Sequence, residues 1–356
     1  MSEAGFPQAP LEFGMFDWIE SSDRPNHEVY EHKLRLAEIA DKGGLWGWHI
    51  AEHTGTPLSI DGAPSVLLSA AIQRTSRLRL GALTWCLPWN DPYRFYNEIR
   101  MLDQMSQGRI ELGVGRGVSP FESHYYGMDD VQQSREVYRE NFAIFLEACK
   151  SEVLNFQGTF HSYKDLELFS HPYQQPYPPL WFPSSNREGI EFTASHGYHT
   201  AHNTGSQSEI RDLFDHYRAV WLQHRDDPNR HNAHVAAPKL ATSKHIVVAG
   251  TDAEAQRWCR QAHTEWADHI GYLGRKMGRD GGSRDRDYDA RVQAGYVMAG
   301  APTTVAQQMI DSVRESTANY VMVVVSFGKL PHEVAEHSLE LFARDVMPAV
   351  KAALAT

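Results

Sequence analysis

The chain is poor in cysteine. Its 356 residues include three cysteines, Cys86, Cys149 and Cys259, which lie far apart and form no CxxC pair. An odd number of widely spaced cysteines argues against a disulfide framework and against a cysteine zinc site. We therefore expect reduced thiols, no bound metal and a cytoplasmic location.

Positive charge and long apolar runs are also scarce. Lysine and arginine total 34 against 45 acidic residues, which gives a formal net charge of −11. A nucleic-acid surface needs a basic face, and no long basic run is present. The most apolar stretch, Tyr320 to Phe327, is too short to span a bilayer, and the N-terminus lacks a signal-peptide pattern. We expect no nucleic-acid partner, no membrane contact and no export.

Several common catalytic motifs are missing. No GxSxG occurs, so a hydrolase nucleophile elbow is unsupported. No GxxxxGK[ST] occurs, which excludes the common phosphate loop of nucleotide-triphosphate enzymes. Two His-Glu pairs, at His27 and at His332, are each followed by a histidine five residues after the first. A helical zinc site needs a spacing of four, so neither pair predicts a metalloprotease.

One segment, from Arg74 to Gly117, predicts a strand, a helix and a second strand. Leu78 to Cys86 alternates and then becomes continuously apolar, as in a buried strand. Apolar residues recur at helical spacing from Tyr93, and a further apolar run ends in the sequence GVGRG. A unit this compact predicts two parallel strands joined by a right-handed crossover. Ligands of such sheets bind where the strands end.

The same alternation continues along the whole chain. Eight strand-like runs are each followed by a helix-like stretch, which favours a (β/α)8 TIM barrel over a doubly wound sheet. We expect a single domain over residues 1–356. The predicted strands are Leu11 to Phe16, Leu45 to Ala51, Leu78 to Cys86, Arg109 to Val114, Leu180 to Pro183, Tyr198 to His202, Leu240 to Val248 and Asn319 to Phe327.

Two insertions interrupt this rhythm, one before the fifth strand and one after the seventh. The first, Ser151 to Pro179, predicts short extra strands and a loop that covers part of the barrel mouth. The second, Gly271 to Asp289, is charged and rich in glycine. A long polar excursion of this kind is either a lid or a floppy loop, and the sequence leaves both open.

Two groups of residues at strand ends suit an anion. Gly115 and Arg116 lie in GVGRG, which lacks the third glycine of a dinucleotide fingerprint; they suit a flat ring or a phosphate, or else a tight turn with a surface ion pair. Small polar residues follow the fifth strand and suit either phosphate binding or ordinary helix capping. They are Ser184, Ser185, Asn186 and Gly189.

These motifs carry a resemblance to a known family. The sequence resembles the bacterial luciferase family of flavin-dependent monooxygenases over most of its length, most weakly from residue 226 to 291. Similarity includes Ala51 to His53, residues 300–305 and the tail at 339–351. The motif residues are Leu87, Pro88, Pro92, Leu102, Asp103, Ser106, Gly108, Arg109, Gly113, Gly115, Arg116 and Gly117.

The resemblance implies roles for particular residues. Arg116 would contact the flavin phosphate together with the small residues from Ser184 to Gly189, and Gly115 would lie near the reactive edge of the ring. Leu83 and Thr84 match a site where a non-proline cis peptide lies beneath the ring.

Two further residues would carry the chemistry according to this resemblance. His53 matches a catalytic histidine, although an isolated histidine is more often structural. Glu122 matches a family carboxylate, and its alternative is a solvated loop acid. The commoner family pattern is Glu-His-His, and this chain has Thr54 in place of the second histidine.

The implied function is a monooxygenase that uses reduced FMN and O2 to oxidise a small organic substrate. A separate flavin reductase would supply the reduced FMN, because no nicotinamide fingerprint is present, and a homodimer is expected through the helices at 64–75 and 93–105. Two alternatives remain: a hydride-transfer oxidoreductase that uses a deazaflavin on the same fold, and a flavin-binding protein without activity.

Overall fold

A ring of parallel strands forms the centre of the protein, as the computed structural model shows for residues 5–117, 119–203, 205–278 and 283–355. Hydrogen-bonded pairs or single bridges join each strand to the next around the ring, so the predicted TIM barrel is confirmed. The ring strands are β1 (Glu12–Asp17), β2 (Gly47–Ile50), β3 (Arg79–Ala82) continued by β4 (Trp85–Cys86), β5 (Leu112–Gly115), β8 (Leu180–Trp181), β9 (Thr200–Ala201), β10 (Leu240–Val248) and β12 (Tyr320–Val324).

Burial on both faces explains why these segments form strands. Every residue of β10 and of β12 is buried, as expected for parallel strands that are covered on one side by helices and on the other by the barrel interior. The apolar residues of β12 satisfy both environments, whereas the middle of β10 also buries polar side chains, among them Lys244, which donates to Gln207 at 2.9 Å. Ring closure then places the C-terminal ends of all eight strands at one end of the barrel.

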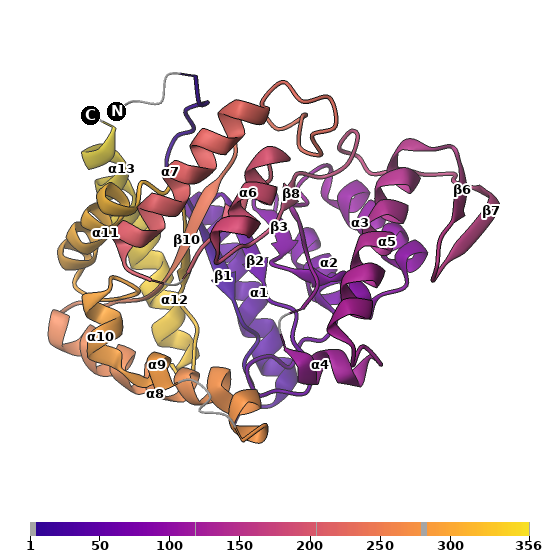
Figure 1. The fold of residues 1–356 in the computed structure, drawn as a ribbon. Coiled ribbons are helices and arrows are strands. Elements are labelled where there is room, and N and C mark those ends of the chain that lie inside the picture. Colours follow the sequence, from indigo (N-terminus) through magenta and orange to yellow (C-terminus); the bar gives the residue numbers. More distant parts are fainter. Residues whose placement is uncertain (1–4, 118, 204, 279–282, 356) are drawn as a thin grey trace.

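Helices surround the ring (Figure 1). The helix α3 illustrates how their ends are set: the Asp91 side chain accepts the Arg94 N–H, Pro92 occupies the first turn, and Gln107 ends the helix in a left-handed conformation. The long outer helices are α1 (Asn26–Gly43), α2 (Pro64–Arg74), α3 (Pro92–Ser106), α5 (Val131–Lys150), α6 (Arg187–Ser195), α7 (Gln207–His224), α8 (Asp252–Lys276), α11 (Pro302–Ser316), α12 (His332–Leu341) and α13 (Met347–Leu354), with a π turn at Phe342–Val346.

Three short helices lie at the C-terminal end of the barrel, along the lower edge of Figure 1: α4 (Pro120–Tyr125), α9 (Ser283–Arg286) and α10 (Tyr288–Gln293). The described helices include none that is both long enough and apolar enough to cross a membrane.

The second insertion differs from the prediction. It was expected to be a lid or a floppy loop from Gly271 to Asp289, but the helix α8 extends into it as far as Lys276, and α9 and α10 occupy most of residues 283–293. Residues 279–282 of this insertion lie outside the described part of the chain. A strand, β11 (Val297–Gly300), was also missed. It pairs with the last four residues of β10, whereas β9 pairs with the first two.

The first insertion forms an antiparallel hairpin, β6 (Val153–Gln157) and β7 (Ser162–Glu167), as predicted. It projects from the side of the molecule at the right of Figure 1. No described residue of 151–179 lines the cleft at the barrel mouth, so the expectation that this insertion covers the mouth is wrong.

Asp41 joins the end of α1 to the start of β3. Its carboxylate accepts the backbone N–H groups of Ser76, Arg77 and Leu78 at 2.9, 2.8 and 2.7 Å. Burial raises the pKa of this carboxyl, but these hydrogen bonds outweigh burial and lower the pKa overall.

We expect Asp41→Asn to lower the free energy of unfolding by about 1.5 to 3 kcal/mol at pH 7, because an amide replaces the charged acceptor. The folded-state pKa is lowered, so this stabilisation is present above the unfolded pKa and is lost as the pH falls through the folded value. Urea unfolding at neutral and acidic pH measures the difference. Glu167→Gln, on the exposed face of β7, is the control; equal effects of the two substitutions would contradict the prediction.

Candidate active site

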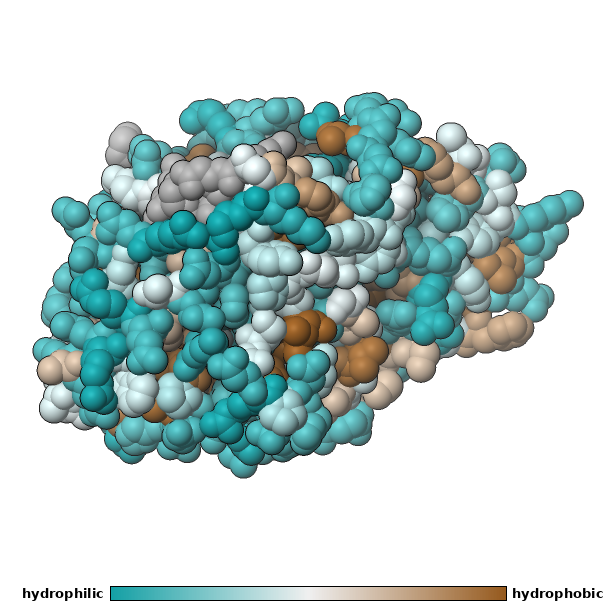
Figure 2. All heavy atoms as spheres, turned by 90° about the horizontal axis from the view of Figure 1, so that it is seen from below, coloured by the Kyte–Doolittle hydropathy of each residue, from teal (hydrophilic) through white to brown (hydrophobic). Residues whose placement is uncertain are grey.

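A cleft of about 510 Å³ opens at the C-terminal ends of the central strands. Residues from β2, β4, β5 and β8 and from the loops after them form its walls. Figure 2 looks onto this end of the barrel and shows a mostly hydrophilic surface with hydrophobic side chains in small groups. Its lining residues are Ala51, Glu52, His53, Leu83, Thr84, Cys86, Trp89, Val114, Gly115, Arg116, Gly117, Glu122, Arg135, Phe182, Pro183, Ser184, Ser185, Asn186 and Gly189.

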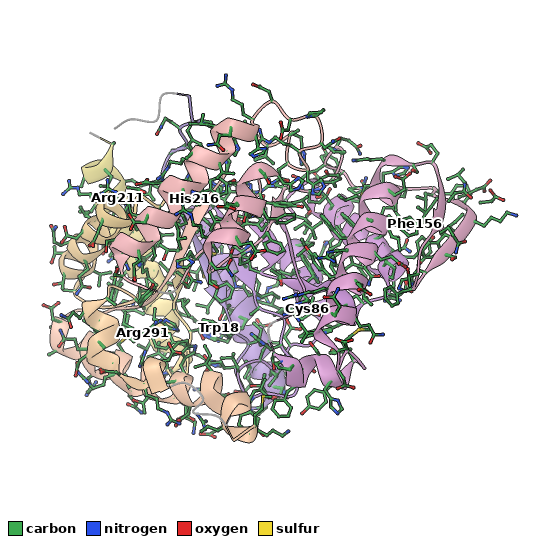
Figure 3. The ribbon with its side chains drawn as sticks, viewed as in Figure 1. Trp18, Cys86, Phe156, Arg211, His216 and Arg291 are labelled. Carbon is green, nitrogen blue, oxygen red and sulfur yellow. The ribbon has the colours of Figure 1, made fainter. Side chains whose placement is uncertain are left out.

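Every residue predicted for the site therefore lines one cleft. In Figure 3, Cys86 marks its position near the centre of the molecule, above α4, whereas Phe156 of the β6–β7 hairpin lies far to the right. The sequence alone contains no distances between these residues, which come from four different strand ends. Ring closure brings them together.

His53 and Glu122 form a close pair at one wall. The Nδ1 atom of His53 lies 3.0 Å from Oε1 of Glu122, and the same oxygen accepts the Thr54 backbone N–H at 2.9 Å. The Glu122 side chain is 1% exposed and that of His53 is 20% exposed, so the carboxylate supports an imidazole that faces the cleft. Glu122 is thus not the solvated loop acid of the alternative interpretation.

A second carboxyl, Glu52, lies beside this pair. Its Oε2 accepts the backbone N–H of Cys86 at 2.5 Å, which joins the end of β2 to β4. Burial, aided by the nearby carboxyls of Asp61 and Glu122, outweighs the hydrogen bonds from Cys86 and raises the pKa of Glu52 to about 8. Burial also raises the pKa of the Cys86 thiol well above its usual value, so Cys86 is not a reactive thiolate.

The floor of the cleft contains the Leu83–Thr84 peptide, which is cis, as the family resemblance led us to expect. Gly115 of β5 lies directly against it. A Cβ atom on Gly115 would lie 2.3 Å from the Thr84 hydroxyl oxygen. The neighbouring Thr84 side chain thus requires a glycine here by itself, and the predicted approach of a ligand to Gly115 stays a prediction.

Two arginines also line the cleft. Arg116 follows β5 and Arg135 lies on α5, and neither guanidinium forms an ion pair or hydrogen bond with a described residue. The N-terminus of α6 faces the same space. Asn186 caps this helix by accepting the Gly189 N–H at 2.8 Å, so the capping interpretation of Asn186 is confirmed.

Hydrogen bonds to Ser184 fix the loop before α6. The Nδ1 atom of the buried His202 lies 2.9 Å from the Ser184 carbonyl oxygen, and the Ser184 hydroxyl donates to the Asn186 carbonyl at 3.2 Å. Ser185 is exposed at the cleft edge. Sequence analysis missed His202 and Arg135: His202 follows a strand, which is a usable signal, but nothing in the sequence indicates that α5 turns Arg135 toward the cleft.

Comparison with known proteins identifies relatives along almost the whole chain. A family model described as luciferase-like monooxygenase matches residues 11–320. An uncharacterized protein of Sinorhizobium fredii, y4wF, is 30% identical over 342 residues, or 96% of this chain and 97% of that protein. The oxygenase component of a flavin-dependent trigonelline monooxygenase from Acinetobacter baylyi is 25% identical over 253 residues, or 69% of this chain and 67% of that protein.

Solved structures share the fold. The oxygenating constituent of 3,6-diketocamphane monooxygenase from Pseudomonas putida, in complex with FMN, has a TM-score of 0.80 at 19% identity and covers 96% of this chain and 98% of its own. An F420-dependent secondary alcohol dehydrogenase has a TM-score of 0.71 at 16% identity, with 96% and 99% covered. At these identities the likeness establishes the barrel and leaves the cofactor open.

We expect Gly115→Ala to destabilise the protein by about 1 to 3 kcal/mol, because the added methyl group overlaps the Thr84 side chain. Thr84→Ala in the same chain should restore most of this loss. Gly250→Ala is the matched control, since its Cβ would meet nothing closer than 3.8 Å. Thermal unfolding of the single and double variants measures the coupling, and purely additive effects would contradict the overlap.

Proposed function

Since the chain belongs to the luciferase-like monooxygenase family, we propose that it is a flavin-dependent monooxygenase that uses reduced FMN and O2 to oxidise a small organic substrate. The observation that carries this proposal is the pair of arginines, Arg116 and Arg135, which have no partner among the described residues and line the same cleft as the N-terminus of α6. Two such guanidinium groups beside a helix N-terminus suit a phosphate group. The flavin-dependent trigonelline monooxygenase among its relatives supports the same class.

The residues of the cleft fit FMN at both ends. Arg116 and Arg135 would hold the phosphate together with Ser184, Ser185, Asn186 and Gly189 at the start of α6, since the capping role of Asn186 does not exclude this contact. Leu83, Thr84 and Gly115 would lie against the ring. When bound in its reduced form, the flavin supplies the electrons that activate O2.

The protein's part in the reaction falls to the His53–Glu122 pair. Glu122 is fixed by the Thr54 N–H and lies at Nδ1 of His53, so it orients the ring and leaves Nε2 to face the cleft. An imidazole held in this way can donate or accept one proton at a substrate or cofactor oxygen. The aromatic rings of Trp89 and Phe182 line the same cleft and would help to exclude water around a bound flavin.

Reduced FMN would come from a separate flavin reductase. The trigonelline relative is named as an oxygenase component, which supports a division of labour of this kind. The second candidate is a deazaflavin-dependent oxidoreductase, favoured by the fold shared with the F420-dependent alcohol dehydrogenase. A binding protein without activity is disfavoured by the intact His53–Glu122 contact.

An anaerobic titration with reduced FMN, riboflavin and reduced F420 tests the proposal. We expect tight FMN binding, followed by O2 consumption when air is admitted. Arg116→Ala and Arg135→Ala should each weaken FMN binding about tenfold or more, because each removes a charged phosphate contact. Riboflavin, which has no phosphate, should bind the variants and the wild type equally.

The matched control is Arg139→Ala, one turn further along α5 and outside the cleft. Binding of F420 alone would move the function to hydride transfer. FMN affinity that is unchanged in both cleft variants would place the phosphate elsewhere and refute the site.

The expected homodimer is part of this proposal. The neighbouring helices α2 and α3 carry large apolar side chains in solvent: Val66 is 70% exposed, Met101 53% and Met105 44%. Apolar groups of this size on adjoining helices suit a subunit interface. Light scattering at micromolar concentration should give twice the chain mass, and Val66→Glu with Met101→Glu should give a monomer. Glu98→Gln, on α3, is the control; a wild-type monomer would contradict the proposal.

We also propose that the chain is one domain whose second insertion closes the cleft as a lid. The end of α8 already contacts α4 at the barrel mouth, where Lys276 Nζ donates to the Tyr125 hydroxyl at 3.1 Å. The single contact between two exposed side chains is weak, so this closure would be readily reversible.

A further inference from the structure

Three carboxyl groups are buried together at the His53 wall. Glu52 is 8% exposed, Asp61 6% and Glu122 1%. Three negative charges cannot share so small a dry volume, because each raises the cost of ionising the others. No arginine or lysine forms an ion pair with Glu52, Asp61 or Glu122 within the described residues. Protons must therefore remain on some of these groups at neutral pH.

Hydrogen bonds indicate which group carries the negative charge. Glu122 Oε1 has two donors, the Thr54 N–H and Nδ1 of His53, and these stabilise a carboxylate. Glu52 accepts one backbone N–H, from Cys86. The Oδ1 atom of Asp61 accepts one backbone N–H, from Ala63, and its Oδ2 atom has no hydrogen-bond partner among the described residues. Glu122 is thus the best site for the charge.

The other groups that face Glu52 act in both directions. The Cys86 thiol on β4 favours the ionised form together with the Cys86 N–H, but burial outweighs both, and the carboxyls of Asp61 and Glu122 oppose a second charge. Tyr126 faces Glu52 from the end of α4. His53 is engaged with Glu122. Arg116 lines the same cleft at the phosphate end.

We propose that Glu52 is a positioning residue that holds a proton in the working enzyme, so that the negative charge beside His53 rests on Glu122. This inference rests on the proposed function for its effect on turnover, but not for the protonation itself. A neutral Glu52 keeps the Cys86 contact and leaves Glu122 ionised, which fixes the Nδ1 hydrogen of His53 toward Glu122. An ionised Glu52 would add a second negative charge beside His53 and would compete with Glu122 for the Nδ1 hydrogen.

The pH dependence follows from burial. Burial raises the pKa of Glu52 to about 8, so the folded protein keeps a proton that the unfolded chain releases near its ordinary range. The folded state binds more protons over this interval, and stability falls as the pH rises toward about 8. Above that value the protein carries the extra charge and turnover should fall.

The test compares wild type, Glu52→Gln and Asp61→Asn. Glutamine keeps a neutral acceptor for the Cys86 N–H but cannot ionise. We expect the melting temperature of Glu52→Gln relative to wild type to rise with pH and to level off above about 8. With reduced FMN supplied, wild-type kcat should be about tenfold lower at pH 9 than at pH 7, and Glu52→Gln should lose this alkaline decline.

Asp61→Asn is the control for a neighbouring buried acid and should keep the alkaline decline in kcat. An infrared band of a protonated carboxyl in the wild type, lost with a midpoint near pH 8, provides a measurement independent of any variant. Parallel melting curves and parallel pH–rate profiles of wild type and Glu52→Gln would overturn the inference. If FMN does not bind at all, the proposed function fails, and the melting curves and infrared band still decide the protonation of Glu52.

Discussion

Closure of eight parallel strands into a ring is the constraint on which the site depends. Several ring strands are short: β8 and β9 have two residues each. Their alignment therefore comes from the neighbours that pair with them, and single bridges at Leu80–Ile110 and Trp181–His199 complete the circle. Since all strands run the same way, closure also sends every following loop to one end. Four of those loops then share a single cleft.

The cleft contains both acidic and basic side chains. Its lining includes the carboxyls of Glu52 and Glu122 and the guanidinium groups of Arg116 and Arg135, which come from different strand ends and from α5. Charges of both signs within one cleft would orient a ligand with an anionic tail, because the guanidinium groups attract that tail and a carboxylate repels it.

Sequence analysis predicted the barrel because the longest buried strands have patterns that only one structure satisfies. The run Leu240 to Val248 matched β10 at both ends. Val297–Gly300 was missed because a four-residue run ending in glycine has no period to detect. Residues 271–276 were assigned to an insertion because that region is charged and rich in glycine, whereas they continue α8, with Gly271 buried. The strand β11 and the end of α8 both depend on packing against neighbouring elements, which a single sequence does not display.

Candidate residues at strand ends were predictable for the same reason that the barrel was: His53, Gly115, Arg116 and Ser184 follow strands directly. The contacts that these residues make could not be predicted from the sequence. The His53–Glu122 pair joins residues 69 apart in the chain, and Arg135 reaches the cleft from an outer helix. Orientation of an outer helix depends on how its side chains fill the grooves beside it, so the outer arginine could be found only from the fold.

Replacement of the second histidine by Thr54 does not weaken the pair at the active wall. The contact that residue 54 makes with Glu122 comes from its backbone N–H, which every residue except proline provides. The Thr54 side chain instead faces Tyr126 and lowers the pKa of its hydroxyl, although burial raises that pKa overall, and the Tyr126 ring stacks on Trp89 at 5.0 Å. Thr54 thus links the loop after β2 to the aromatic wall of the cleft. The departure from the family pattern changes the wall and leaves His53 and its carboxylate in place.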